Sequence, residues 1–167
     1  LFITQSQDIP SGKLNDLNAN DLSIKYPIFI KPRWGHTSAG SKDCYKINNK
    51  NDLQRYINKP NMMWSTFINA NEGMTDFIMK EGKILYQITY EYSPKQHVFA
   101  DDWKYISPLS KPPDKINDWV KKHLPDYTGP LNVQYRDDII IEVSLRFARR
   151  GSYIKSTGNS ALIQNIN

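Results

Sequence analysis

The sequence has little cysteine, little histidine and no long hydrophobic run, and each of these shortages excludes a class of protein. Its single cysteine, Cys44, excludes an internal disulfide and fits a reducing compartment. Its three histidines lack the spacing of zinc ligands, which argues against a zinc site. No stretch approaches the roughly 18 apolar residues that cross a bilayer, so we expect a soluble, cytoplasmic chain with no membrane partner.

Basic residues exceed acidic ones, but they are not gathered into a basic arm. The 167 residues include 22 Lys and Arg against 17 Asp and Glu, which gives a net charge of +5 and a pI near 9.2. The basic residues are scattered along the chain. A modest excess of this kind fits a site for a polyanionic nucleotide, surface lysines without a specific role, or a nucleic-acid-associated domain.

The length allows one domain or two small lobes, because a chain of this size buries about 70% of its unfolded surface. We find no repeat, no low-complexity tract and no extended linker. No secretory signal is visible at the start. The first residue is Leu1 instead of Met, which suggests a processed or trimmed chain that has lost an upstream signal or domain.

Apolar runs separated by turn residues predict mostly strands in the first 92 residues. Pro32 should stop the first strand, and the Glu81-Gly82 pair should form a hairpin turn between the last two. Asn51-Asp52 should cap a helix over 51–57. The expected strands are 27–31, 44–47, 63–68, 74–80 and 83–92, the last three in one antiparallel sheet.

One helix and one hairpin are predicted in the rest of the chain. Residues 111–113 form a proline-rich loop, after which Asp114 should cap a helix over 114–123 with Ile116, Trp119 and Val120 facing inward. Strands at 131–135 and 139–143 should pair across a tight turn at 136–138.

The first strand and the loop after it carry groups suited to a phosphate. Lys31 ends the strand, where a fixed ammonium can meet a phosphate oxygen. In the loop 35–40, Gly-His-Thr-Ser-Ala-Gly, small residues let backbone amides approach an anion closely. An ordinary hairpin turn is the alternative. Further along, Glu72 and Asp76 begin a strand and can supply an acceptor to a ribose hydroxyl, or can be a solvated strand end.

The hairpin near residue 137 carries groups suited to a hard cation. Gln134 and Glu142 lie on its two strands, so both side-chain oxygens can face one side. Magnesium takes few protein oxygens and several from phosphate, which fits one carboxylate plus an amide. Arg146 stands four residues beyond Glu142, within reach of the phosphate that such an ion would hold. A polar hairpin with an incidental glutamate is the alternative.

These motifs resemble those of the ATP-grasp superfamily, particularly the branch of the carbamoyl phosphate synthetase large subunit. Residues 129–134, Gly-Pro-Leu-Asn-Val-Gln, are similar to its Gly-x-x-Asn-x-Gln strand, and 142–146, Glu-Val-Ser-Leu-Arg, to its Glu-Val-Asn-Pro-Arg strand. Residues 27–32 are similar to the strand with the phosphate-binding lysine, and 67–72 to the Phe-Ile-x-Gly-x-Glu hinge that holds adenine and ribose. Similar segments run in order from about residue 24 to 161.

The resemblance implies an α+β ATP-grasp fold, with two small lobes that each contain an antiparallel sheet and helices and a nucleotide cleft between them. The lobes would span 1–65 and 66–167. It implies catalytic roles for Lys31 and Arg146. The other implied contacts are Lys31, Gly35, Ser38, Ala39, Gly40, Phe67, Ile68, Glu72 and His97 for ATP, and Gln134, Glu142 and Ser144 for Mg2+.

The sequence departs from the family pattern at several positions. Ser144 replaces the asparagine that is the second metal ligand, and Leu145 replaces a proline. Thr66 stands where an acidic adenine contact is common, and Ala70 stands for glycine. The family's N-terminal domain, which helps to form the acceptor site, is not in the sequence. Either it was removed, or another chain supplies it, or the protein binds nucleotide without ligation.

The function implied by the resemblance is an ATP- and Mg2+-dependent ligase for small-molecule substrates. It would activate a carboxylate as an acyl phosphate, which an amine or similar nucleophile then attacks. The second hypothesis is a degenerate ATP-grasp module with a nucleotide-binding or structural role in a larger assembly. The third hypothesis is a basic nucleic-acid-associated domain.

Overall fold

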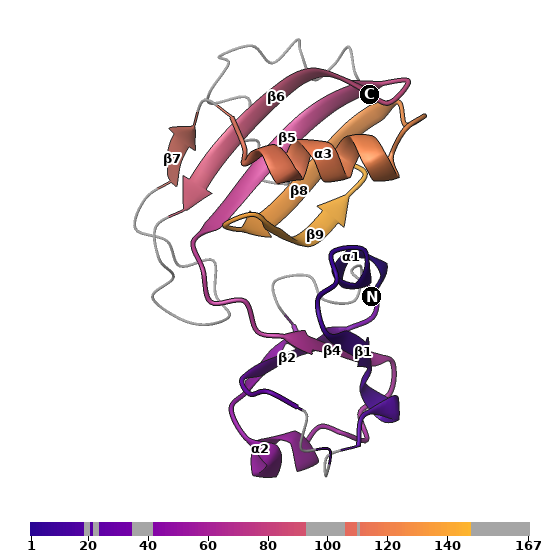
Figure 1. Ribbon diagram of the computed structural model, residues 1–167, viewed down its shortest axis with the longest axis vertical. Helices are drawn as coiled ribbons and strands as arrows, with labels where there is room; N and C mark the ends of the chain where they lie inside the picture. Colours follow the sequence, from indigo (N-terminus) through magenta and orange to yellow (C-terminus); the bar gives the residue numbers. More distant parts are fainter. Residues whose placement is uncertain (19–20, 22–23, 35–41, 93–105, 110, 148–167) are drawn as a thin grey trace. The chain divides into compact units, whose positions relative to one another are not determined.

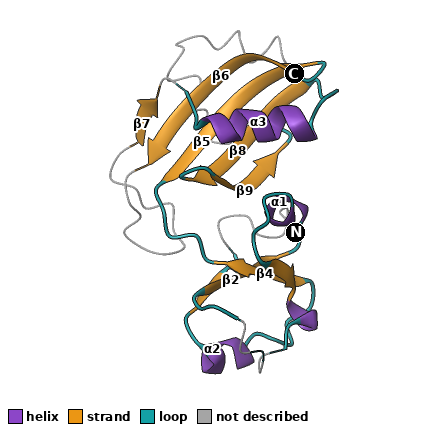
Figure 2. Cartoon of the chain, viewed as in Figure 1, coloured by secondary structure: helices purple, strands orange, loops and turns teal. Residues whose placement is uncertain are grey.

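Two antiparallel sheets organise the chain, one in each of two units (Figures 1 and 2). The computed structural model describes residues 1–18, 21, 24–34, 42–92, 106–109 and 111–147. Among these residues, the first unit takes everything up to Asn69 and the second begins at Ala70. None of the described helices has the length and apolarity to cross a membrane.

The first unit is a four-stranded sheet in the order β1-β4-β2-β3, with every neighbouring pair antiparallel. The strand β2 continues through Pro32, which pairs with Met62 as the last residue of the strand. The elements are α1 Phe2–Gln5, β1 Ser11–Lys13, the 3-10 helix η1 Leu14–Asp16, β2 Ile28–Pro32, β3 Tyr45–Ile47, α2 Lys50–Gln54 and β4 Met62–Thr66.

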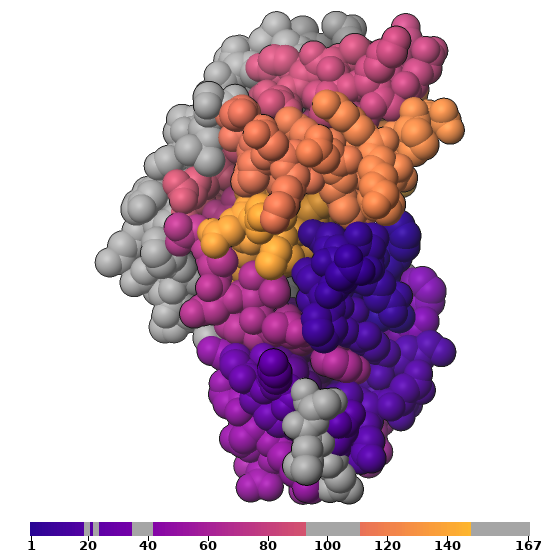
Figure 3. Space-filling model, viewed as in Figure 1, coloured from indigo at the N-terminus to yellow at the C-terminus, as the bar shows by residue number. Residues whose placement is uncertain are grey.

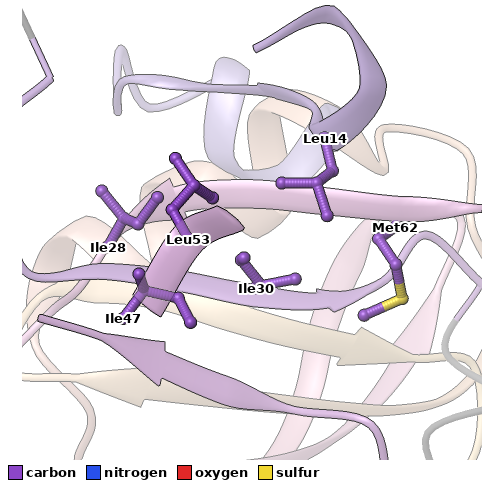
Figure 4. Close-up of a cluster of buried hydrophobic side chains, with 6 residues drawn as sticks. All are labelled: Leu14, Ile28, Ile30, Ile47, Leu53 and Met62. Carbon is purple, nitrogen blue, oxygen red and sulfur yellow. The ribbon is translucent and has the colours of Figure 1, made fainter. Parts of the chain in front are cut away.

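One face of this sheet is covered by η1 and α2 and forms the core of the first unit. Ile28 and Ile30 alternate along β2 onto this face, and both are fully buried. Leu53 from α2 packs onto the same cluster, so a helix of five residues is stabilised by packing more than by its own length. Figure 4 shows the buried side chains of the cluster: Leu14, Ile28, Ile30, Ile47, Leu53 and Met62.

Two local expectations for this unit were wrong. The cap of α2 is Asn49, not Asn51-Asp52: its side chain accepts from the Asp52 backbone N–H at 3.0 Å and donates to the Asp52 carboxylate at 2.9 Å. The first of these bonds satisfies one backbone donor of the first turn, and the second holds the two side chains together. The strand expected at 63–68, observed as β4, pairs with β1 and β2 instead of joining the strands after residue 72.

A small ring of polar groups fixes the start of β3. The Tyr45 hydroxyl donates to Asp43 Oδ1 at 2.8 Å, and the Lys59 ammonium lies 3.1 Å from the same carboxylate oxygen and 2.9 Å from the hydroxyl. The Tyr45 and Lys59 hydrogen bonds lower the pKa of the Asp43 carboxyl. Because Asp43 and Lys59 are 16 positions apart, the ring ties β3 to the chain that leads into β4.

The second unit is a five-stranded antiparallel sheet in the order β7-β6-β5-β8-β9. The predicted hairpin turn at Glu81-Gly82 is confirmed, since both residues have positive φ, 49° and 72°, as a two-residue hairpin turn requires. The elements are β5 Glu72–Lys80, β6 Lys83–Tyr92, β7 Ile106–Leu109, α3 Asp114–His123, β8 Gly129–Arg136 and β9 Ile139–Ser144.

The helix α3 lies across one face of this sheet (Figures 1 and 2). The helix residues Ile116 and Val120 are fully buried. The strands direct an apolar row of side chains to one face of the sheet, and its members Phe77 on β5 and Leu131 on β8 are fully buried too. Since those side chains need an apolar cover, we infer that α3 covers this face. Asp114 is not the helix cap that was expected; it is a first-turn residue that follows Pro113.

The exposed turn of the last hairpin is also held by α3. Lys115 forms an ion pair with Asp138, which lies in the two-residue turn between β8 and β9. The Lys115 hydrogen bond lowers the pKa of the Asp138 carboxyl. The turn that positions β9 is thus tied to the helix on one face of the sheet.

We predict that Leu131→Ala lowers the free energy of unfolding of the second unit by about 2–5 kcal/mol, because it leaves a cavity at a fully buried position. The matched change Leu85→Ala, at a side chain 60% exposed, should stay within about 0.5 kcal/mol. Urea denaturation of both variants measures the difference. Equal losses for the two would mean that this face of the sheet is not packed as described.

Candidate functional site

The face of the second sheet opposite the apolar row is polar. Side chains alternate along each strand, and residues opposite each other in register share a face. The register places Glu72 opposite Arg136, Met74 opposite Gln134 and Asp76 opposite Asn132. The polar residues that this pattern directs to one face are Glu72, Asp76, Asn132, Gln134, Arg136, Glu142 and Ser144.

A single extra residue in β9 brings Glu142 onto this face. Tyr135 pairs with Ile140, and the next rung pairs Gln134 with Glu142, so Ile141 is a bulge without a counterpart on β8. Without the bulge, Ile141 would lie opposite Gln134 and Glu142 would turn to the apolar face, because one step in register reverses every side chain. The bulge therefore creates the Gln134/Glu142 pair.

Three oxygen donors lie on two adjacent rungs of the hairpin. Gln134 pairs with Glu142, and Asn132 pairs with Ser144. The Ser144 hydroxyl donates to Glu142 Oε1 at 3.4 Å. Glu142 is exposed, and chain around β9, coloured yellow, reaches the surface in Figure 3. The predicted metal residues Gln134, Glu142 and Ser144 are therefore brought together.

This donor set fits magnesium in its chemistry, since carboxylate, amide and hydroxyl oxygens are hard ligands. Within the part of the chain that the structure describes, no group of three or more His, Cys, Asp or Glu side chains could hold a metal ion. The hairpin thus offers one carboxylate, Glu142, with neutral oxygens beside it. Such a set leaves several coordination positions to phosphate or water.

Two buried polar pairs join β5 and β8 beside these donors. Asn132 donates to Asp76 Oδ1 at 2.8 Å, and both residues are 2% exposed. Arg136 Nη2 donates to Glu72 Oε2 at 3.3 Å, with both side chains largely buried. Along β8 these pairs stand on either side of Gln134. The middle rung is therefore held between two fixed polar contacts.

The sheet of the first unit has a basic face with aromatic residues. Phe29 lies opposite Lys46, and Lys31 lies opposite Met63, so Phe29, Lys31 and Lys46 share the face away from the core cluster. The Lys46 ammonium lies 4.5 Å from the centroid of the Phe67 ring, and that ring lies 6.2 Å from Phe29. Ammonium groups beside aromatic rings are suited to a ligand that combines anionic groups with a flat base.

The predicted site residues divide between the units. Within the first unit, Lys31 and Phe67 lie on the same face, and Ile68 follows Phe67 beyond β4. Within the second, Glu72 shares a face with the three hairpin donors. Arg146 follows β9 and donates to the Phe147 carbonyl at 3.0 Å. The remaining predicted contacts lie outside the described residues: Gly35, Ser38, Ala39, Gly40 and His97.

Three residues beside these positions were not singled out by sequence reasoning. Asn132 was interpreted only as part of a motif. Arg136 was interpreted only as part of a turn, although Arg136 is the last residue of β8. Lys46 was counted among scattered surface lysines. Alternation along the strands was the signal that could have placed them, because each shares a face with a predicted site residue.

No family model matches the chain, and no curated protein matches its sequence. Several solved structures match its fold. An L-amino acid ligase from Bacillus licheniformis has a TM-score of 0.65 at 18% identity, over 91% of this chain and 41% of that chain. An N5-carboxyaminoimidazole synthetase from Staphylococcus aureus complexed with ADP has a TM-score of 0.67 at 18% identity, over 89% and 43%. A D-alanine–D-alanine ligase from Bacillus anthracis complexed with ATP has a TM-score of 0.62 at 17% identity, over 98% and 62%.

These likenesses show the fold: the chain has the α+β architecture of the ATP-grasp ligases. The predicted α+β fold class is confirmed, with an antiparallel sheet in each unit, the helices α1 and α2 in the first and the helix α3 in the described part of the second. The chain spans 41–62% of the length of the three structures described.

We predict that Asn132→Leu lowers the free energy of unfolding of the second unit by about 1–3 kcal/mol, because it removes a donor from a buried carboxylate. The double variant Asp76→Val/Asn132→Leu should recover most of this loss, since neither polar partner is then left buried. Urea denaturation compares the two chains. A double variant as unstable as the single one would show that the pair is not the source of the effect.

Proposed function

We propose that the chain forms the nucleotide-binding part of an ATP- and magnesium-dependent ligase that joins a carboxylate to an amine or a similar nucleophile. The observation that carries this proposal is the bulged register of β8 and β9, which sets Glu142 and Ser144 opposite Gln134 and Asn132 in an ATP-grasp fold. The names of the matching structures support it, because they are ligases and synthetases, some complexed with ATP or ADP.

We assign each part of the nucleotide and the metal to individual residues. Lys31 would meet phosphate oxygens, while Phe67 and Ile68 would contact the adenine. Glu72 would accept hydrogen bonds from the ribose. The hairpin donors Gln134, Glu142 and Ser144 would hold magnesium, which when bound would offset the charge of the triphosphate. We also propose that five further residues contact the nucleotide and its phosphates through their backbone or side chains: Gly35, Ser38, Ala39, Gly40 and His97.

The proposed reaction has two displacements. A carboxylate oxygen of the substrate attacks the γ-phosphorus of ATP, the bond from that phosphorus to the bridging oxygen breaks, and ADP leaves. The amine then attacks the carbonyl carbon of the acyl phosphate, and inorganic phosphate leaves. Lys31 and Arg146 would stabilise the negative charge on the transferring group. No side chain of this chain has to act as a covalent nucleophile.

The acceptor site is proposed to lie partly outside this chain. Since the matching ligases are longer than the sequence, another part of the protein or a second chain would complete the site for the small-molecule substrates. Ser144 favours a second candidate, a module that binds nucleotide without turnover, because a hydroxyl is a weaker ligand than the amide oxygen of the family pattern.

Release of ADP separates the two candidates. With Mg2+ and a panel of carboxylates and amines, a ligase should release ADP only when a productive pair is present, whereas a binding module should bind ATP and release none. Reactions without Mg2+ are the control. ATP affinity without release of ADP for any pair would favour the binding module over the ligase.

We predict that Glu142→Gln weakens binding of ATP in the presence of Mg2+ by about tenfold or more, because it replaces the one carboxylate among the three proposed metal ligands. Titration calorimetry measures the affinity. Glu81→Gln, an exposed glutamate in the β5–β6 turn, is the matched control and should leave it unchanged. An unchanged affinity for Glu142→Gln would remove the metal assignment.

A further inference from the structure

The ion pair of Glu72 and Arg136 occupies one end of the polar face. Glu72 is the first residue of β5 and Arg136 the last residue of β8, and the two are opposite each other in register. Their side chains are 9% and 18% exposed. Just beyond this rung, the Asp137 backbone N–H donates to the Asn71 carbonyl at 2.8 Å. Both the side chains and the backbone therefore fix this end of the two strands.

Burial makes the contact with the arginine important for Glu72. A carboxylate taken out of water is unfavourable in its ionised form unless a cation or hydrogen-bond donors accompany it. Arg136 supplies both through a contact of 3.3 Å to Oε2. A carboxylate accepts several hydrogen bonds, so the contact with Arg136 is compatible with hydrogen bonds from a ligand.

The strand β8 links this ion pair to the hairpin donors. Arg136 and Gln134 are two residues apart on one face, which corresponds to roughly 7 Å along a strand. Gln134 lies opposite Glu142 on the next strand. A ligand that meets both Glu72 and the hairpin donors would therefore lie along a face whose spacing is set by the two strands.

We propose that Arg136 is a positioning residue, which holds the Glu72 carboxylate in the orientation that accepts hydrogen bonds from the two ribose hydroxyls of the bound nucleotide. This inference rests on the proposed function, and it names the part of the ligand that the Glu72–Arg136 pair recognises. A pair with only a structural role would stabilise the end of the sheet without distinguishing nucleotides by their hydroxyls.

The experiment compares ATP with 2′,3′-dideoxy-ATP, which lacks both ribose hydroxyls. Calorimetry with Mg2+ measures the affinity of each nucleotide for the unaltered chain, Arg136→Gln and Arg136→Lys. The unaltered chain should prefer ATP by about tenfold or more, the contribution of a hydrogen bond to a charged group. Arg136→Gln should lose about tenfold in affinity for ATP and little for the dideoxy nucleotide, so the preference falls toward one.

Two control variants sharpen the test. Arg136→Lys keeps the charge but not the planar guanidinium, so it should restore part of the preference. Arg55→Gln, at an exposed arginine in the first unit, should leave both affinities unchanged. If Arg136→Gln does not fold, the preference measured for Arg136→Lys decides: it should be lower than that of the unaltered chain.

The outcomes that overturn the proposal are distinct. An equal loss of affinity for both nucleotides in Arg136→Gln, or an unchanged preference in Arg136→Lys, would assign the pair a structural role alone. Equal affinities of the unaltered chain for the two nucleotides would end this inference and leave the proposed function standing. Binding of neither nucleotide would overturn the proposed function, and this inference with it.

Discussion

The pairing register between β8 and β9 is the constraint on which the candidate site depends. Side chains repeat every two residues along a strand, so a shift of one position exchanges the two faces of β9. Ile139 and Ile140 follow the turn in step with β8, and the bulge at Ile141 then changes the phase. One extra residue thus leaves Ile140 on the apolar face and directs Glu142 to the polar one.

The two faces of the second sheet are stabilised by different interactions. Under α3, fully buried apolar side chains such as Phe77 and Val133 contribute through removal of surface from water. On the polar face, Asp76 and Asn132 are equally buried, and the 2.8 Å hydrogen bond from Asn132 to Asp76 Oδ1 offsets part of the cost of burying them. Gln134 lies between this pair and Arg136, so the polar contacts fix its neighbours in place. Fixed neighbours are what a site with definite ligand geometry requires.

Local patterns predicted the elements better than their partners. Alternation and the Glu81-Gly82 turn predicted the β5–β6 hairpin, and apolar spacing predicted α3. In contrast, β1 has only three residues, too few for a period to be recognised. The strand β4 belongs to the first sheet because it pairs with β1 and β2 across long loops. Local sequence patterns do not predict such pairing. The ion pair of Arg136 could not be predicted from local patterns either, because Glu72 lies 64 positions away in the sequence.

The composition of the hairpin has a consequence for how the proposed ligands would bind. Glu142 is the single carboxylate among its three donors, and Gln134 and Ser144 contribute no charge. A hard divalent cation held by one carboxylate keeps most of its positive charge uncompensated, whereas the phosphates of a nucleotide would compensate it. The metal and the nucleotide would therefore each raise the affinity for the other by the same factor, because coupling between two bound ligands is reciprocal. As a proposed ligand, the Ser144 hydroxyl would strengthen this dependence, since a weaker protein ligand would leave a larger share of the coordination to the phosphates.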